Sequence, residues 1–235
     1  MASVASLREH LVEELNDLLN AEQQLVEALP MMAERATRKE LQSAFRRHLA
    51  ETKTHERRVT QALKALNEDA SGTTCEAMKG LLEEGQELMS SGEPGALLDA
   101  MLITAAQKVE HYEIASYGTV RTYANVLGEK KVAQLLDQNL RDEKNADKKL
   151  TTIAEGAVNR QAAKEWHERQ SAMSLLEKGA EWLGSTVGSV TKRVMPRGSG
   201  AGRQARSQAA DRTHRGQGSR SNHERSRQRT RARKR

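Results

Sequence analysis

The sequence AAQKVEHYEIASYG, residues 105–118, places two glutamates inside a helical pattern that is otherwise typical of a protein core. At 100° per residue, Leu102, Val109 and Glu113 fall on one face of a helix, and Glu110 lies beside that face. At least one carboxylate therefore points where an apolar side chain is expected. Burying several ionised carboxylates together is prohibitive unless a cation compensates their charge.

The other long helical segments carry the same kind of interruption near their middle. Antiparallel packing would bring all of these polar side chains to a similar height, so the pattern predicts one cluster in the core. The interrupting residues are Glu22 in residues 7–29, His48, Glu51 and His55 in residues 41–66, and Glu143 and Asp147 in residues 132–154.

The composition favours an all-α chain. Aromatic residues make up only 3% of the 235 residues, and there are three prolines. Capping boxes that begin at Ser6, Thr37 and Thr73 predict three helix starts, and Pro30 is expected to kink or interrupt the first helix. The short helix expected in residues 73–90 would lie in a crossover connection of an antiparallel four-helix bundle.

We expect three parts along the chain. Residues 1–158 form the bundle, residues 159–194 an amphipathic C-terminal helix, and residues 195–235 a disordered, Arg-rich basic tail. Trp166 and Trp182 are expected to anchor the C-terminal helix to the bundle or to a partner subunit rather than to a membrane.

Charge is distributed very unevenly between these parts. The net charge of the chain is +6, but residues 191–235 hold 15 Lys and Arg against Asp211 and Glu224. Such a tail predicts salt-dependent binding to nucleic acid, with a solvated charge run and an anionic membrane surface as the alternatives. The tail residues assigned to nucleic-acid binding are Arg225, Arg227, Arg229, Arg231, Arg233, Lys234 and Arg235.

The N-terminal sequence and the cysteine count indicate a compartment. The first residues, MASVASLREHL, lack a basic segment followed by an apolar one, and no run approaches the roughly 18 apolar residues of a membrane span. The single Cys75 cannot form an internal disulfide, which suits a reducing environment. We therefore expect a cytoplasmic protein without a transmembrane segment.

Carboxylates and imidazoles from four helices are the ligand set of di-iron and di-manganese bundle proteins. Hard oxygen donors with one or two imidazoles suit Fe or Mn, and the lack of thiolates disfavours a structural zinc site. Glu110 and Glu113 could bridge and terminally ligate two ions. The spacing of Glu51 with His55, like that of Glu143 with Asp147, could hold one ion.

Four segments stand out as motifs: AEQQLVEALP at 21–30, FRRHLAET at 45–52, AAQKVEHYEIASYGT at 105–119, and DEKNAD at 142–147 with the following Lys149 and Leu150. Together they resemble the YciE/YciF group of ferritin-like bacterial stress proteins. The resemblance implies a ferritin-like bundle, usually dimeric, related to rubrerythrin-type di-iron proteins and often described as ferroxidase-like. The ligands that it implies are Glu22, Glu51, Glu110, Glu113 and Glu143, with His55 and Asp147 less firmly matched.

The sequence departs from the usual Glu-x-x-His ligand pair of ferritin-like proteins. Thr54 follows Glu51 by three residues, and Ala146 follows Glu143 by three. A site with this spacing could be weaker or built differently. Beside the ligands, His48 is expected to donate to a carboxylate rather than to bind metal, and Tyr117 is placed near the site.

The sequence therefore predicts a di-metal stress protein, with iron as the first choice, that oxidises Fe(II) or consumes peroxide. Two alternatives remain open at this point. One is a non-enzymatic stress or interaction protein whose carboxylate core is vacant or structural. The other is a di-manganese, catalase-like enzyme with the same cluster. A homodimer is expected in each case.

Overall fold

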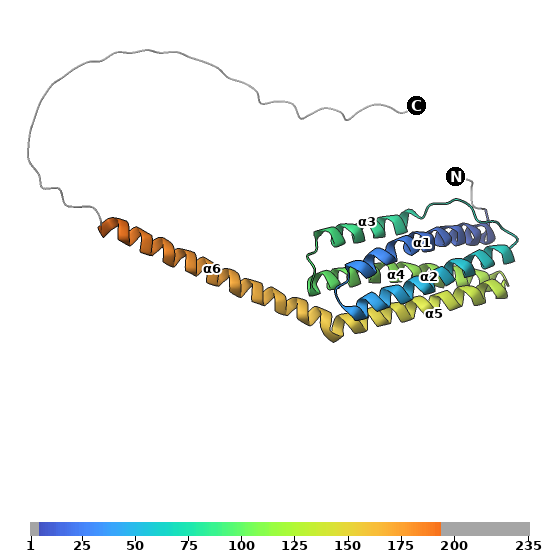
Figure 1. Cartoon of the computed structure of the whole chain (residues 1–235). Helices are drawn as coiled ribbons and strands as arrows, with labels where there is room; N and C mark the ends of the chain where they lie inside the picture. The colour runs from blue at the N-terminus through green and yellow to red at the C-terminus, as the bar shows by residue number, and fades with distance from the viewer. Residues whose placement is uncertain (1–4, 194–235) are drawn as a thin grey trace, which may run out of the picture. The chain divides into compact units, whose positions relative to one another are not determined.

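A computed structural model of the chain describes residues 5–193, with side chains from residue 5 to residue 183. Four long helices pack so that each contacts its neighbours in antiparallel orientation: α1 and α5 each pack against α2 and α4 (Figure 1). This arrangement confirms the predicted all-α, ferritin-like four-helix bundle. The helices are α1 (Leu7–Arg35), α2 (Lys39–Ala65), α4 (Ala96–Val126) and α5 (Lys130–Ile153).

A shorter helix, α3 (Glu76–Ser91), lies in the long connection between α2 and α4. It packs along α4 and α1 on the outside of the bundle (Figure 1). The predicted crossover helix is therefore confirmed. Because this connection returns the chain along the bundle, α2 and α4 run in the same direction, which is typical of ferritin-like topology.

The helix ends agree only partly with the predicted capping boxes. Ser6 accepts a hydrogen bond from the backbone N–H of Glu9 at 3.2 Å, as expected for the start of α1. The capping box predicted at Thr73 is wrong, because Cys75 is the N-cap of α3 and its Sγ accepts the Met78 N–H. Pro30 does not interrupt α1, which continues to Arg35.

The capping box predicted at Thr37 is also wrong. The start of α2 is capped by a side chain from another helix, the buried Asp99 of α4. Its carboxylate accepts the Thr37 N–H at 2.7 Å, the Thr37 hydroxyl at 2.6 Å and the Arg38 N–H at 3.1 Å. This bond set ties the turn between α1 and α2 to α4.

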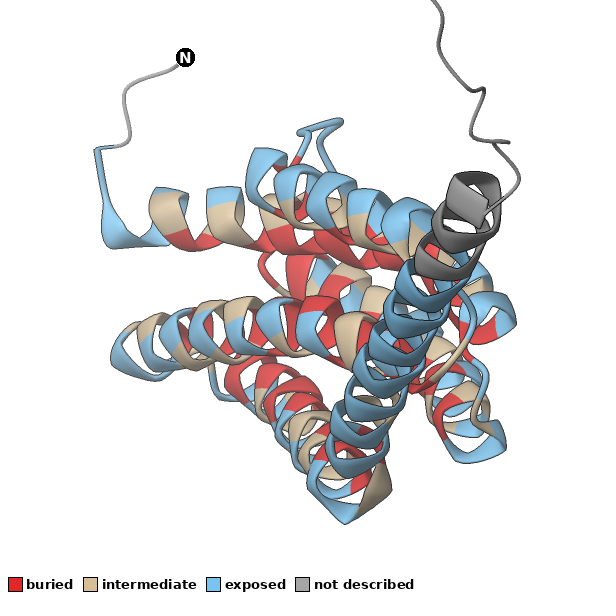
Figure 2. Ribbon diagram, turned by 90° about the vertical axis from the view of Figure 1, so that its left-hand side faces the viewer, coloured by how far each residue is buried: buried red, intermediate tan, exposed pale blue. Residues whose placement is uncertain are grey.

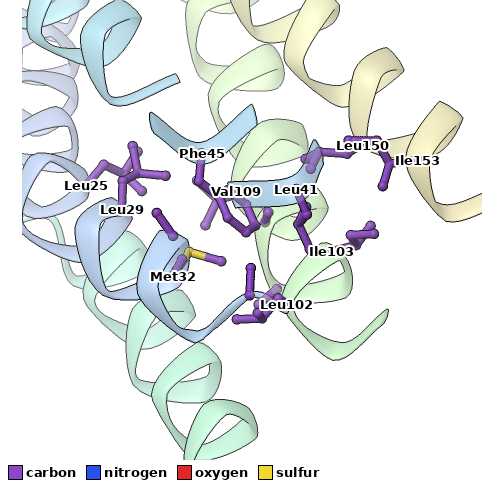
Figure 3. Packing of buried hydrophobic residues seen from close by; sticks show 14 of the residues in the cluster. Leu25, Leu29, Met32, Leu41, Phe45, Leu102, Ile103, Val109, Leu150 and Ile153 are labelled. Carbon is purple, nitrogen blue, oxygen red and sulfur yellow. The ribbon is translucent and has the colours of Figure 1, made fainter. Parts of the chain in front are cut away.

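The apolar core is divided into two clusters by a layer of polar side chains at mid-height. One cluster includes Leu25, Phe45 and Val109 and is shown in Figure 3. The other includes Leu15, Val59 and further residues nearer the opposite end of each helix. Figure 2 shows that the buried residues line the inward faces of the helices. The buried ones among the polar residues singled out from the sequence lie between the two clusters.

Beyond α5 the chain remains helical through a π-helical turn, Ala154–Val158, into α6 (Asn159–Arg193). The apolar side chains of α6 up to residue 183 are largely exposed, with Trp166 at 60% and Trp182 at 66%. Contacts divide the chain into two units at Gly184, and the bundle belongs to the first. No helix among the described residues is long and apolar enough to cross a membrane.

The predicted tail lies outside the described residues. This applies to the whole of residues 195–235, including the proposed nucleic-acid-binding residues Arg225, Arg227, Arg229, Arg231, Arg233, Lys234 and Arg235.

Candidate metal centre

Each of the four bundle helices contributes to a polar cluster between the two apolar clusters. These side chains occupy positions where the helical repeat would otherwise place leucine or valine, so the packing of the bundle holds them inside. The cluster consists of Glu22 from α1, His48 and His55 from α2, Glu110 and Glu113 from α4, and Glu143 from α5, all buried to at least 94%.

The cluster contains two groups of donor atoms that meet at Glu143. In the first, one donor atom each from His48, Glu110, Glu113 and Glu143 lie within 4.8 Å of one another. In the second, Glu22, His55 and Glu143 meet the same limit. A carboxylate shared by two groups is the arrangement that bridges a pair of metal ions.

The distances within the groups are short. His48 Nε2 lies 3.2 Å from a Glu110 oxygen and 3.7 Å from a Glu143 oxygen. His55 Nδ1 lies 2.7 Å from a Glu143 oxygen and 3.6 Å from a Glu22 oxygen. The rings of the two histidines are 6.3 Å apart, so each serves a different group.

Most donor atoms in the cluster make no well-aligned hydrogen bond, although His48 Nε2 and His55 Nδ1 lie close to carboxylate oxygens. Buried polar atoms are almost always paired in folded proteins, so a concentration of unpaired ones calls for a ligand. The unpaired atoms are Glu22 Oε2, His48 Nδ1 and Nε2, His55 Nδ1, Glu110 Oε2, and both carboxylate oxygens of Glu113 and of Glu143.

The pKa values of three carboxyl groups in the cluster are raised. Burial raises the pKa of Glu110 and of Glu113 well above the usual range, and the neighbouring Glu143 charge adds to both shifts. Burial also raises the pKa of Glu22, although His55 acts in the opposite direction. Without a cation, these carboxyls are therefore held toward their protonated forms.

The two histidines are held toward their charged forms. Burial lowers the pKa of His48, but the charge of Glu110 and contacts with other carboxylates outweigh burial and raise it to about 9. His55 follows the same pattern, with Glu143 and Glu22 raising its pKa to about 10. The cluster thus holds protons on donor atoms, and a metal ion that bound to these atoms would displace the protons.

The donor set fits two divalent ions. The four glutamates supply four negative charges, which balance two divalent cations, and the two imidazoles remain neutral ligands. Carboxylate oxygens with one imidazole per ion suit Fe or Mn, and the described residues bring no thiolate into the cluster. The residues present therefore fit a di-metal centre.

Further side chains orient the donors. The Tyr117 hydroxyl donates a short hydrogen bond to Glu22. His55 Nε2 lies 3.3 Å from Asp142, which accepts a 2.8 Å hydrogen bond from Arg58. A carboxylate on the outer nitrogen of a histidine fixes its tautomer and leaves the other nitrogen for the metal. The sequence prediction missed Asp142 and Arg58, although Arg58 follows His55 by one helical turn.

Two of the predicted ligands lie outside both groups. Glu51 is half-buried, with its carboxylate 3.7 Å from Arg47 Nε and 3.6 Å from His48 Nδ1. Asp147 accepts a 3.1 Å hydrogen bond from Gln107 and lies 3.4 Å from His111. His48, which was expected to donate to a carboxylate, lies 3.2 Å from Glu110 and is also among the donors of the first group.

Known proteins are similar to this chain over the bundle. The family described as Domain of unknown function (DUF892) matches residues 6–163. Protein YciF of Escherichia coli (strain K12) is 42% identical over 161 residues, covering 68% of this chain and 97% of YciF.

Two solved structures are similar over the bundle. The E. coli stress protein YciF aligns with a TM-score of 0.64 at 42% identity, over 66% of this chain and 99% of that structure. YcfI from Rhodopseudomonas palustris aligns with a TM-score of 0.62 at 39% identity, over 64% and 96%. The family match ends within α6, so most of α6 and the tail lie beyond it.

Proposed function

The chain belongs to the DUF892 family, and we propose that this member is a di-iron carboxylate protein that oxidises Fe(II). The observation that carries the proposal is the shared Glu143, which joins two groups of buried donors. Two ferrous ions bound there as substrate would give two electrons to one oxidant, which also takes up two protons: dioxygen would become hydrogen peroxide, or hydrogen peroxide would become two waters.

In this proposal each side chain has a defined part. Glu143 would be a ligand in both sites, His48, Glu110 and Glu113 would supply the other ligands of one site, and Glu22 with His55 those of the other. Tyr117 and Asp142 orient Glu22 and His55 through the contacts described above. The apolar clusters cover the polar layer on either side.

Glu51 and Asp147 have a different place in the proposal from the one the sequence suggested. Glu51 is half-exposed and close to His48, and Asp147 faces α4 through Gln107. We assign neither a direct bond to the metal pair. Manganese remains the competing metal, because the donor set suits it equally well.

The relative YciF is described as a stress protein. Consumption of Fe(II) together with peroxide would protect the cytoplasm under stress, since these two reactants generate hydroxyl radicals. The assembly we propose is a homodimer. The net charge of +13 carried by residues 191–235 favours attachment to nucleic acid, which would bring this chemistry close to it.

The experiment for the central proposal is anaerobic Fe(II) titration followed by exposure to air. We expect about two Fe(II) bound per chain and a ferric absorbance that grows at least tenfold faster than in buffer. Glu143→Gln should bind less iron at both positions, because it removes the shared charge. Arg141→Gln, a change on the exposed side of α5, is the control and should behave as the parent. Equal iron oxidation by the Glu143→Gln protein would contradict the proposal.

The tail proposal has its own test. Removal of residues 196–235 should abolish binding to duplex DNA in roughly 0.1 M salt while leaving iron oxidation unchanged. Unchanged DNA affinity in the truncated protein would leave the tail as a solvated charge run.

A further inference from the structure

A cavity of about 50 Å³ lies beside the polar cluster. Residues of only one of the two donor groups line it. Its lining includes His48 and Glu110 from the first group and no residue of the second, so the shared Glu143 does not line it either. Glu22 and His55, at the other group, are fully buried under Tyr117. The first donor group therefore borders a cavity, whereas the second is enclosed by side chains.

The cavity connects the cluster with the protein surface. Exposed Arg47 and Asn145 line it together with the half-buried Glu51, whereas its inner part is lined by buried residues. His48 and Glu110, both at least 94% buried, belong to this inner lining. The geometry thus provides a path from solvent to one half of the centre.

The walls of the cavity are mainly apolar. Leu25, Leu29, Met32, Phe45, Val109 and Leu150 all line it, and Figure 3 shows these side chains gathered from α1, α2, α4 and α5. A volume of about 50 Å³ holds only a few small molecules, because one water needs roughly 10–15 Å³. Pockets for larger organic ligands measure roughly 300–1,000 Å³.

Size and polarity together select the occupant. A molecule that enters must be small and must tolerate apolar walls without losing hydrogen bonds to water. Hydrogen peroxide and hydrated cations pay for desolvation along such walls, whereas dioxygen does not. We propose that this cavity is the dioxygen access route and that dioxygen meets the centre at the His48 and Glu110 side. This inference rests on the proposed iron oxidation and names its oxidant.

The test begins with the metal-free full-length chain. Xenon is an apolar probe of similar size, and its binding can be followed by shifts in NMR signals of the lining methyl groups. We expect shifts at Leu25, Leu29 and Val109 in the parent. Ala106→Leu, which fills the cavity from α4, should abolish them. Ala133→Leu is the matched control, because Ala133 is equally buried but packs in the other apolar cluster.

The second arm uses the iron-loaded protein. Ala106→Leu should bind iron as the parent does, yet slow the reaction with dioxygen at least fivefold, and should slow the reaction with hydrogen peroxide less. Three results would overturn the inference: no xenon shifts at these residues in the parent, an unchanged dioxygen rate in Ala106→Leu, or equal slowing with both oxidants. Failure of iron binding in the parent would instead refute the proposed function, and the xenon arm would still report on the cavity.

Discussion

His55 Nδ1 lies 2.7 Å from an oxygen of Glu143, and both side chains are fully buried at the centre of the bundle. One comes from α2 and the other from α5, so this contact joins two helices at the height where the apolar core is interrupted. The same Glu143 faces His48 in the other donor group. The two groups therefore share a carboxylate, and changes there affect both.

Replacing Glu113 should separate stability from metal binding. Both of its oxygens are buried and unpaired, and its pKa is raised well above the usual range by burial and neighbouring carboxylates. Glu113→Gln removes the need to bury an ionisable carboxyl, so we expect the metal-free protein to gain about 1–2 kcal/mol of stability. Urea denaturation of metal-free protein measures this gain, and isothermal titration should find weaker metal binding. A less stable variant would contradict the account.

The contact between Asp142 and His55 should matter for metal affinity. Asp142→Asn keeps the shape of the side chain but removes the charge that orients the imidazole. We expect metal affinity to fall roughly 10- to 100-fold with little loss of stability. Competition with a coloured chelator measures the affinity. Asp137→Asn is the control, because it removes the charge of a carboxylate that forms a partly exposed ion pair with Arg141 on the same helix. If both variants bind alike, Asp142 has no positioning role.

The stability of the metal-free protein should fall as pH rises. His48 and His55 have folded pKa values of about 9 and about 10, against an ordinary value of 6.5. Their stabilising contribution is complete below about pH 6.5 and is lost as the pH rises through 9 and 10. The raised pKa values of Glu110 and Glu113 act in the same direction, because the folded state holds protons that the unfolded state releases.

Calorimetry of metal-free protein between pH 6.5 and pH 9.5 tests this expectation. We expect Tm to fall by roughly 5–10 °C, which corresponds to a few kcal/mol for a chain of this size. The double variant His48→Gln/His55→Gln should show a flatter profile. A Tm that rises over this interval in the parent would contradict the assigned protonation states.

Asp99 should be important for stability but not for the metal. It is buried and accepts three hydrogen bonds from Thr37 and Arg38 at the start of α2. Asp99→Ala leaves these donors unsatisfied, so we expect a loss of about 2–3 kcal/mol. Thr37→Val removes only one of the bonds and should cost less. Denaturant titration measures both, and metal stoichiometry should stay at the parent value.

The fold could be predicted because the signal for it is local and repeated. Leucines and valines recur at helical spacing in four segments, and the short connections that follow α1 and α4 leave only antiparallel neighbours. The cap at Asp99 could not be predicted in this way. It lies more than sixty residues from Thr37, and only the packed bundle brings the two together.

Not every ligand of the candidate site could be predicted from the sequence, because neighbouring residues of one helical turn differ in burial. On α2 the buried positions Phe45, His48 and His55 define the inward face, and Thr52 lies within it. Glu51 falls about 80° from the middle of that face at 100° per residue, so it reaches the margin of the core. A glutamate seemed the better ligand by chemistry, but the helical phase favours Thr52 for burial.

The most direct test of the account is elemental analysis of protein purified without chelator, beside the Glu110→Ala/Glu143→Ala double variant. Circular dichroism of both proteins would establish that the bundle is folded. We expect about two ions of Fe or Mn per chain in the parent and almost none in the variant. Equal metal content in the two proteins, or none in the parent even after anaerobic Fe(II) loading, would contradict it and make the carboxylates structural.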